Sequence, residues 1–230
     1  MEVQVGWMAK VDNPKTPYEL MTEFTKRGDP KGWFEELYKS ASGEATHIPW
    51  ADLSANANLV WWLGGHSESA RSGKALVVGC GLGDDAELLA SRGLQVTAFD
   101  ISPTAIEWCR GRFSASKVDY RVADACAMPS GWMGMFDFIF EANTLQALPP
   151  VLRIQALVQI SQSLRVNGQL LVIARAREPE EPEGTLPWPL TRGEFSEFER
   201  HGLKLVEWKD FMDDEVPPVR RFLGLYSRPA

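Results

Sequence analysis

A glycine-rich stretch, VVGCGLGDD at residues 77–85, places carboxylates where a ligand could approach the backbone closely. A dinucleotide-binding GxGxxG motif would have its third glycine at the position of Asp84, and Asp85 and Glu87 follow. Carboxylates at the start of a helix stabilise its dipole, but they would repel a pyrophosphate that needs the same amide groups. The loop therefore favours a cationic ligand, although Asp84 could also simply cap its helix.

Two further carboxylates end neighbouring apolar runs. Asp100 lies twenty-one residues after Gly79, close to the spacing expected for an acid that accepts hydrogen bonds from a ribose diol. Asp124 ends the next run and could accept from an adenine amino group. One such aspartate is commonly only a turn residue, but three at one sheet edge predict a nucleoside site. S-adenosylmethionine carries an ammonium, a sulfonium and no phosphate, so the charges favour it over a dinucleotide.

From Lys74 onward, apolar runs alternate with amphipathic segments, which is typical of βαβ units. The predicted strands are residues 75–78, 96–99, 118–122, 136–140, 170–174, 203–208 and 222–226. The predicted helices are residues 84–91, one capped by Ser102, one starting at Pro149-Pro150 with Ile154, Leu157, Val158 and Leu164 on one side, and one capped by Thr191. The last two strands are joined closely enough to pair antiparallel.

The first part of the chain lacks this alternation. We predict that residues 1–70 form an N-terminal helical extension packed on the domain formed by residues 71–230. Asp29-Pro30 can start a helix, and residues 59–63, closed by Gly64-Gly65, read as a second, buried helix.

Composition narrows the possible partners. The formal net charge of −7 and the pI near 5.1 argue against a nucleic-acid partner. The sequence has no apolar run long enough to span a bilayer and no secretion signal, so we predict no membrane partner and a cytoplasmic location. The three cysteines show no metal-ligand or disulfide pattern. A monomer and a homodimer both fit the sequence.

Five stretches together resemble the ordered motifs of class I S-adenosylmethionine-dependent methyltransferases, over about residues 74–230. These stretches are residues 77–85, 99–109, 123–125, 136–148 and 164–174. The resemblance implies an α/β fold with a doubly wound, mostly parallel seven-stranded sheet in the order 3-2-1-4-5-7-6, its last strand antiparallel. It also implies S-adenosylmethionine as the cofactor.

The resemblance also implies a role for each matching residue. The loop against the methionine and ribose portions would be formed by Gly79, Cys80, Gly81, Gly83 and Asp84. Asp100 would hold the ribose hydroxyls, Ile101 would pack on the adenine, and the adenine edge would be contacted by Asp124 and Ala125. The residues under the methionine portion would be Glu141, Ala142 and Asn143.

Upstream, residues 32–38 and 48–60 resemble the N-terminal lid of the thiopurine and halide or thiol methyltransferase group. That resemblance implies that Trp33, Tyr38 and Trp50 close over the cofactor. The alternative is that these aromatic residues are core packing for an additional helical layer.

Methyl transfer is an in-line displacement that removes the sulfonium charge, so an enclosed pocket of low polarity favours it. A thiolate or halide acceptor needs no general base, whereas a hydroxyl or protonated amine does. Glu141 and Asn143 are the candidate catalytic residues, although Glu141 could only hold the cofactor's amino group. Four arginines could recognise an anionic acceptor or simply be solvated: Arg175, Arg177, Arg220 and Arg221.

The residues after the fourth and fifth strands narrow the chemical class of the methyl acceptor. Strand four ends in Glu141-Ala142-Asn143-Thr144 and not in the Asn- or Asp-Pro-Pro-aromatic run of enzymes that methylate DNA bases or protein glutamine. Arg175 stands where catechol-type enzymes have acidic metal ligands, so we predict a small-molecule acceptor and no metal. The alternatives are an NAD-dependent oxidoreductase on a related fold and a non-catalytic S-adenosylmethionine-binding protein.

Overall fold

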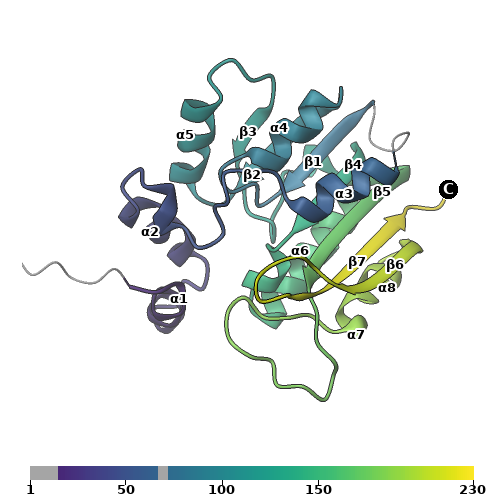
Figure 1. Ribbon diagram of the computed structural model, residues 1–230. Helices are drawn as coiled ribbons and strands as arrows, with labels where there is room; N and C mark the ends of the chain where they lie inside the picture. The colour runs from purple at the N-terminus through teal and green to yellow at the C-terminus, as the bar shows by residue number, and fades with distance from the viewer. Residues whose placement is uncertain (1–14, 67–71) are drawn as a thin grey trace, which may run out of the picture.

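The computed structural model describes residues 15–66 and 72–230, which form a seven-stranded sheet with helices on both faces (Figure 1). The strands are β1 (Lys74–Val78), β2 (Gln95–Asp100), β3 (Asp119–Val122), β4 (Phe136–Ala142), β5 (Leu164–Arg175), β6 (Lys204–Met212) and β7 (Arg220–Ser227). Their order is β3-β2-β1-β4-β5-β7-β6, with β7 antiparallel to both neighbours. The predicted fold class and strand order are confirmed.

Two groups of helices cover the sheet. The helices are α1 (Pro17–Lys26), α2 (Gly32–Ser40), α3 (Ala57–Gly65), α4 (Asp84–Ser91), α5 (Pro103–Arg112), α6 (Pro150–Ser163), α7 (Arg192–Phe195) and α8 (Glu197–Arg200). The apolar residues of α3, α4 and α5 pack on one face, and those of α6, α7 and α8 pack on the other (Figure 1). Because both faces are covered, residues 75–78 of β1, 138–140 of β4 and 170–174 of β5 are apolar and buried, as a parallel sheet requires.

Local sequence signals explain where several helices begin. The Ser102 hydroxyl accepts from the backbone N–H of Ala105 at 3.0 Å, and Pro103 follows it, so α5 starts as predicted. Thr191 and Glu194 form a reciprocal capping box at α7. The same box, formed by Thr16 and Glu19, starts α1, a helix that the sequence analysis did not predict.

Other elements differ from prediction in detail. On α6, Leu157 is buried as predicted, but Ile154 is half exposed and Arg153 is buried, so the predicted apolar face of this helix was wrong at Ile154. Leu164 is not in α6 at all, because β5 already begins at this residue. The helix predicted after Thr191 is divided into α7 and α8.

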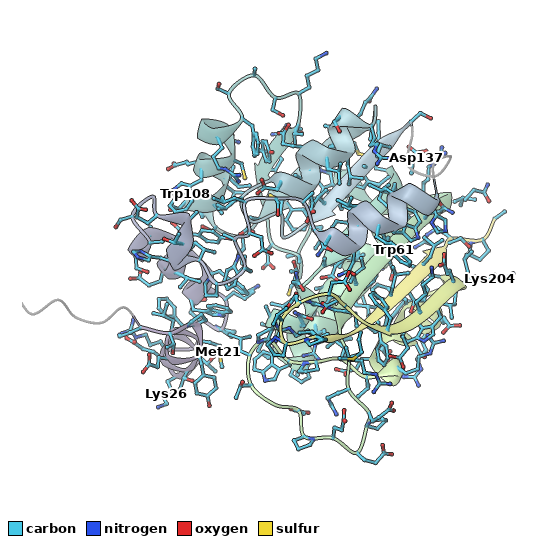
Figure 2. All side chains as sticks on the ribbon, in the orientation of Figure 1. Met21, Lys26, Trp61, Trp108, Asp137 and Lys204 are labelled. Carbon is cyan, nitrogen blue, oxygen red and sulfur yellow. The ribbon has the colours of Figure 1, made fainter. Side chains whose placement is uncertain are left out.

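The N-terminal helices pack against the carboxyl ends of the strands. A cluster of buried residues from α1 and α2 includes Trp33 and Tyr38, and it extends to Leu82 of the glycine loop and Ala105 of α5. Tyr38 of α2 meets Trp108 of α5 edge-on, with ring centroids 6.2 Å apart. Figure 2 labels Trp108 in this region. Residues 1–14 and 67–70 of the predicted extension lie outside the described residues. Within the described ranges, every helix is too short or too polar to cross a membrane.

Candidate functional site

The glycine loop between β1 and α4 has a backbone that only glycine adopts easily. Gly79 has a φ of 58° and Gly83 a φ of 92°, both in the left-handed region. A Cβ atom on Gly79 would overlap the Thr144 hydroxyl, and one on Gly83 would lie 2.6 Å from the Tyr120 hydroxyl. The loop can therefore follow this path only without side chains at these two positions.

Asp100 ties the end of β2 to this loop. Its carboxylate accepts from the backbone N–H of Gly81 at 3.1 Å and from that of Ser102 at 2.9 Å. Burial raises the pKa of this carboxyl to about 6. Ile101 and Cys80 are half-buried on either side of the contact. Asp100 therefore fixes the loop and presents its remaining lone pairs at the sheet edge.

The three carboxylates at the start of α4 all have partners inside the protein. Asp84 forms two hydrogen bonds with the guanidinium of Arg112, at 2.8 and 2.9 Å. Asp85 accepts from the backbone N–H of Asn56 at 2.7 Å, and burial raises its pKa to about 6. The third carboxylate, on Glu87, accepts from the Tyr120 hydroxyl at 2.7 Å. Most of the negative charge that the sequence places here is therefore already engaged in contacts that stabilise the position of α4.

Asp124, after β3, is also occupied. One carboxylate oxygen accepts from the backbone N–H of Cys126 at 2.8 Å, and the other pairs with Lys31, just before α2. Ala125 beside it is buried. The N-terminal segment therefore reaches the residue that the resemblance assigns to the adenine edge.

Glu141 is the least satisfied carboxylate of the site. Its side chain is fully buried, and it lies opposite Val78, where β1 enters the glycine loop. One oxygen accepts from the backbone N–H of Leu145 at 2.9 Å, while Oε2 has no hydrogen-bond partner among the described residues. Burial raises the pKa of Glu141 to about 7. A buried carboxylate oxygen without a partner is costly, which points to a ligand group that completes it.

Beyond Ala142, the chain turns through Asn143, whose φ is 70°. Its side-chain oxygen accepts from the amide of Gln146 at 3.1 Å. The carbonyl of the same Gln146 side chain accepts from the backbone N–H of Arg175 at 2.8 Å. Gln146 is a buried residue that was not predicted from the sequence, because its contact with Arg175 comes from the fold and not from any local motif.

The N-terminal aromatic residues lie over the glycine loop. Trp33 and Tyr38 are buried, and Trp50 donates from Nε1 to the Tyr38 hydroxyl at 2.9 Å. A Cβ atom on Gly81 would lie 3.4 Å from that hydroxyl and 4.0 Å from the Trp50 ring. The indole N–H of Trp33 has no partner among the described residues. These contacts fit both a lid over the loop and a packed helical layer.

Glu35 is a second site-region residue that the sequence analysis missed. Its carboxylate accepts from the Ser102 hydroxyl at 2.5 Å and from the backbone N–H and hydroxyl of Thr104 at 3.2 and 2.9 Å. Glu35 therefore joins α2 to the turn that follows Asp100.

Most of the arginines near β5 and β7 already have partners. Arg220 pairs with Asp210 and Glu178, and Arg221 pairs with Asp213 and Glu215. Arg177 donates to backbone carbonyls of its own loop. Recognition of an anionic acceptor by these three would require existing contacts to break.

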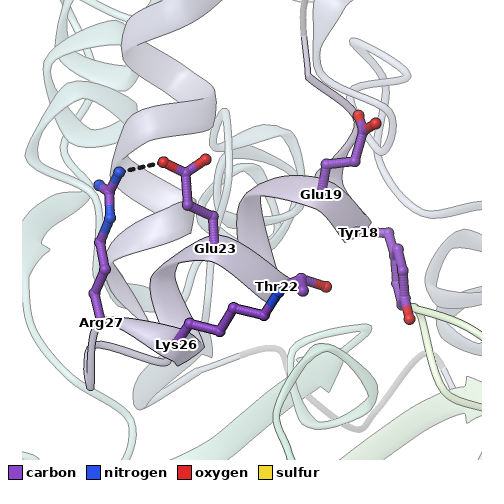
Figure 3. A pocket seen from close by; sticks show the side chains of 6 residues that line it. All are labelled: Tyr18, Glu19, Thr22, Glu23, Lys26 and Arg27. Atoms are coloured by element: carbon purple, nitrogen blue, oxygen red, sulfur yellow. Dashed lines mark hydrogen bonds and ion pairs between the residues drawn. The ribbon is translucent and has the colours of Figure 1, made fainter.

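A shallow surface depression lies elsewhere. It runs along one side of α1 and is lined by Tyr18, Glu19, Thr22, Glu23, Lys26 and Arg27 (Figure 3). None of these residues is a predicted site residue.

Comparisons with known proteins agree with this architecture. Residues 75–168 match a family model described as a methyltransferase domain. The ubiquinone biosynthesis O-methyltransferase of Xanthomonas oryzae pv. oryzae is 33% identical over 109 residues, which are 46% of this chain and 44% of that protein. A probable thiol methyltransferase 2 of Arabidopsis thaliana is 29% identical over 160 residues, 68% of this chain and 65% of that protein. The chain thus spans less than half of the first relative and just under two thirds of the second.

A solved structure shares the fold. The 1,6-didemethyltoxoflavin-N1-methyltransferase of Burkholderia thailandensis, solved with 1,6-didemethyltoxoflavin and S-adenosylhomocysteine, has a TM-score of 0.68 at 16% identity. The match covers 98% of this chain and 99% of that one. Residues 75–168 thus match a methyltransferase domain, and the described residues share the fold of this solved methyltransferase.

Proposed function

We propose that this protein is an enzyme that binds S-adenosylmethionine at the carboxyl edge of the sheet and transfers its methyl group to a small-molecule acceptor. The observation that carries the proposal is Glu141, a buried carboxylate whose Oε2 has no partner, at the point where β1 enters the glycine loop. The cofactor's ammonium is the complementary charged donor, and its pairing with Glu141 would offset the cost of burial.

The residues around Glu141 fit the rest of this cofactor. Gly81 has no side chain where Tyr38 and Trp50 lie over the loop, and Asp100 keeps lone pairs that suit a ribose diol. Ile101 and Ala125 would pack on the adenine, with Asp124 at its edge. When bound, S-adenosylmethionine supplies a methyl group on a positively charged sulfur that leaves as a neutral thioether.

The protein's own part in the reaction is to bind, align and exclude water. Trp33, Tyr38 and Trp50 form the lid over the glycine loop, so that the methyl group meets its acceptor in an enclosed, weakly polar space. Glu141 at the end of β4 and Asn143 just after it would hold the two reactants in line. A small-molecule acceptor agrees with the acidic composition, which disfavours nucleic acid, and a cytoplasmic location stays a prediction from sequence.

The cofactor part of the proposal is tested by calorimetry with S-adenosylhomocysteine. We expect micromolar binding to the wild type and a loss of at least about tenfold in Glu141→Gln, because the neutral amide cannot form the ion pair. Glu36→Gln, the same change at an exposed position on α2, is the matched control and is expected to stay within about twofold of wild type. Binding of NADH without binding of S-adenosylhomocysteine would instead favour an oxidoreductase.

The catalytic part requires turnover with S-adenosylmethionine across thiols, phenols, amines and halides. We expect methylation of at least one class. Tight cofactor binding with no turnover of any class would favour a non-catalytic binding protein.

A further inference from the structure

The buried side chain of Gln146 connects two strand ends on the side of β4 that faces away from the glycine loop. Its Oε1 accepts from the backbone N–H of Arg175, at the end of β5, and its Nε2 donates to Asn143 Oδ1, just after β4. The backbone carbonyl of Gln146 accepts from the N–H of Trp188 at 2.8 Å, which brings the loop between β5 and α7 to the same place.

The orientation of the Gln146 amide is fixed by chemistry. A backbone N–H can only donate, so the atom that faces Arg175 N must be the carbonyl oxygen of the glutamine. The NH₂ group must then face Asn143, which can answer it only with its own carbonyl oxygen. The amide of Asn143 consequently has one allowed orientation, with its NH₂ group turned away from Gln146.

That NH₂ group is available to a ligand. Asn143 is partly exposed, and no hydrogen bond from its Nδ2 is formed with any residue in the described ranges. The next residue, Thr144, turns the other way and donates to the carbonyl of Val78 beside the glycine loop. Asn143 is thus tied through Gln146 to the β5 side of the sheet, where Gln146 also accepts from the backbone N–H groups of Arg175 and Trp188.

We infer that Asn143 is a specificity-determining hydrogen-bond donor for the methyl acceptor, and that the acceptor nucleophile is an anion with free lone pairs, such as a thiolate, a phenolate or a halide. This inference rests on the proposed function. An amide NH₂ group stabilises an anionic nucleophile but offers nothing to an ammonium, which has only donors. Glu141 is not needed as a base for such an acceptor, so it can remain paired with the cofactor.

The test begins with Asn143→Asp, which keeps the size of the side chain and replaces its only donor by a negative oxygen. Aspartate tolerates left-handed backbone about as well as asparagine, so the variant should fold. With thiophenol as the acceptor, we expect the KM to rise about 10- to 100-fold while the affinity for S-adenosylhomocysteine stays within about twofold. Asn167→Asp is the matched control, because Asn167 is exposed and has a φ of 61° but lies at the start of β5.

Gln146→Glu tests the positioning role of the glutamine. A carboxylate still accepts from Arg175 N but cannot donate, so Asn143 should turn its NH₂ group toward residue 146 and its oxygen toward the acceptor. We expect the same selective rise in KM for thiophenol. A rise in the dissociation constant of S-adenosylhomocysteine without a change in this KM would overturn the inference, because it would assign the Asn143 amide to the cofactor's carboxylate.

A readout that needs no turnover comes from nuclear magnetic resonance. The side-chain NH₂ signal of Asn143 is followed in the S-adenosylhomocysteine complex while iodide is added. We expect a saturable shift that is absent in Gln146→Glu, and no such shift at Asn167. If the complex forms but iodide leaves the Asn143 signal unmoved, the inference fails while the proposed function stands. If the complex does not form at all, the proposed function fails first.

Discussion

The two sides of β4 hold their polar groups in different ways. On the side of β1 the polar groups are carboxylates. Asp100 accepts from two backbone N–H groups, and Glu141 has one oxygen that accepts a hydrogen bond and one without a partner among the described residues. On the side of β5 the polar groups are neutral amides: the side chain of Gln146 orients that of Asn143 through a hydrogen bond between uncharged groups. The difference teaches that buried carboxylates lie on the side where a cationic cofactor would bind, whereas the polar groups that orient Asn143 on the β5 side are neutral amides.

The largest effect on the free energy of unfolding is expected at the contact between Gly79 in the glycine loop and Thr144 just after β4. Gly79→Ala should lower the free energy of unfolding by about 2–4 kcal/mol, because the new methyl group overlaps the Thr144 hydroxyl and the backbone has a positive φ. Urea denaturation followed by circular dichroism measures this.

Gly28→Ala separates the two contributions to that loss. Gly28 also has a positive φ, of 80°, but a Cβ atom there would meet no atom within 4 Å. It should therefore cost only about 1 kcal/mol, from backbone strain alone. Equal losses in the two variants would mean that the packing of Thr144 on the glycine loop contributes nothing.

The β1 side of the site was largely predictable from sequence, and the β5 side was not. The helix at Asp84–Ser91, the cap at Ser102 and the position of Asp100 follow from residues close in the chain. On the β5 side, the contact of Gln146 with Arg175 joins residues 29 positions apart, which no local pattern reports. The one contact on the β1 side that could not be predicted, between Glu35 and Ser102, joins residues 67 positions apart.

Two other differences have separate causes. The capping box of α1 was visible in the sequence and was overlooked. Arg153 is buried because it donates to the carbonyls of Leu145 and Leu148 and pairs with Glu194, and apolar periodicity cannot foresee such a satisfied charge.

Asp100→Ala tests whether the carboxylates on the β1 side contribute to cofactor binding. It should weaken binding of S-adenosylhomocysteine by about 1–3 kcal/mol, because a charge-assisted hydrogen bond to the ribose is lost and Gly81 N loses its partner. Calorimetry on protein shown to be folded measures it. Asp119→Ala, at the exposed start of β3, is the control and should bind normally. Unchanged affinity in Asp100→Ala would place the ribose elsewhere.

The pH dependence follows from Glu141, whose pKa burial raises to about 7. The folded protein then holds this proton more tightly than the unfolded chain, so without ligand the contribution of Glu141 makes the fold less stable as pH rises from about 4.5 to 7. Binding a cationic ligand requires the charged form, so affinity should change in the opposite direction. We expect the contribution of Glu141 to lower the affinity about fivefold from pH 7 to pH 6 as its charged fraction declines.

Calorimetry at pH 6, 7 and 8 with the wild type and Glu141→Gln checks this dependence. The variant should lose the part of the profile centred near pH 7 and keep only the weakening near pH 6 that belongs to Asp100, whose pKa burial raises to about 6. Identical profiles for the two proteins would remove Glu141 from the cofactor site.

The smallest effect is expected at Asp84, although it is the most conspicuous acid of the glycine loop in the sequence. Its ion pair with Arg112 is partly exposed, so Asp84→Asn should lower the free energy of unfolding by less than about 1 kcal/mol. Because Arg112 already neutralises this carboxylate, the affinity for S-adenosylhomocysteine should stay within about twofold. A tenfold loss in calorimetry would mean that Asp84 acts on the cofactor directly, and that the useful charge of the site begins at the start of α4 and not only at Asp100 and Glu141.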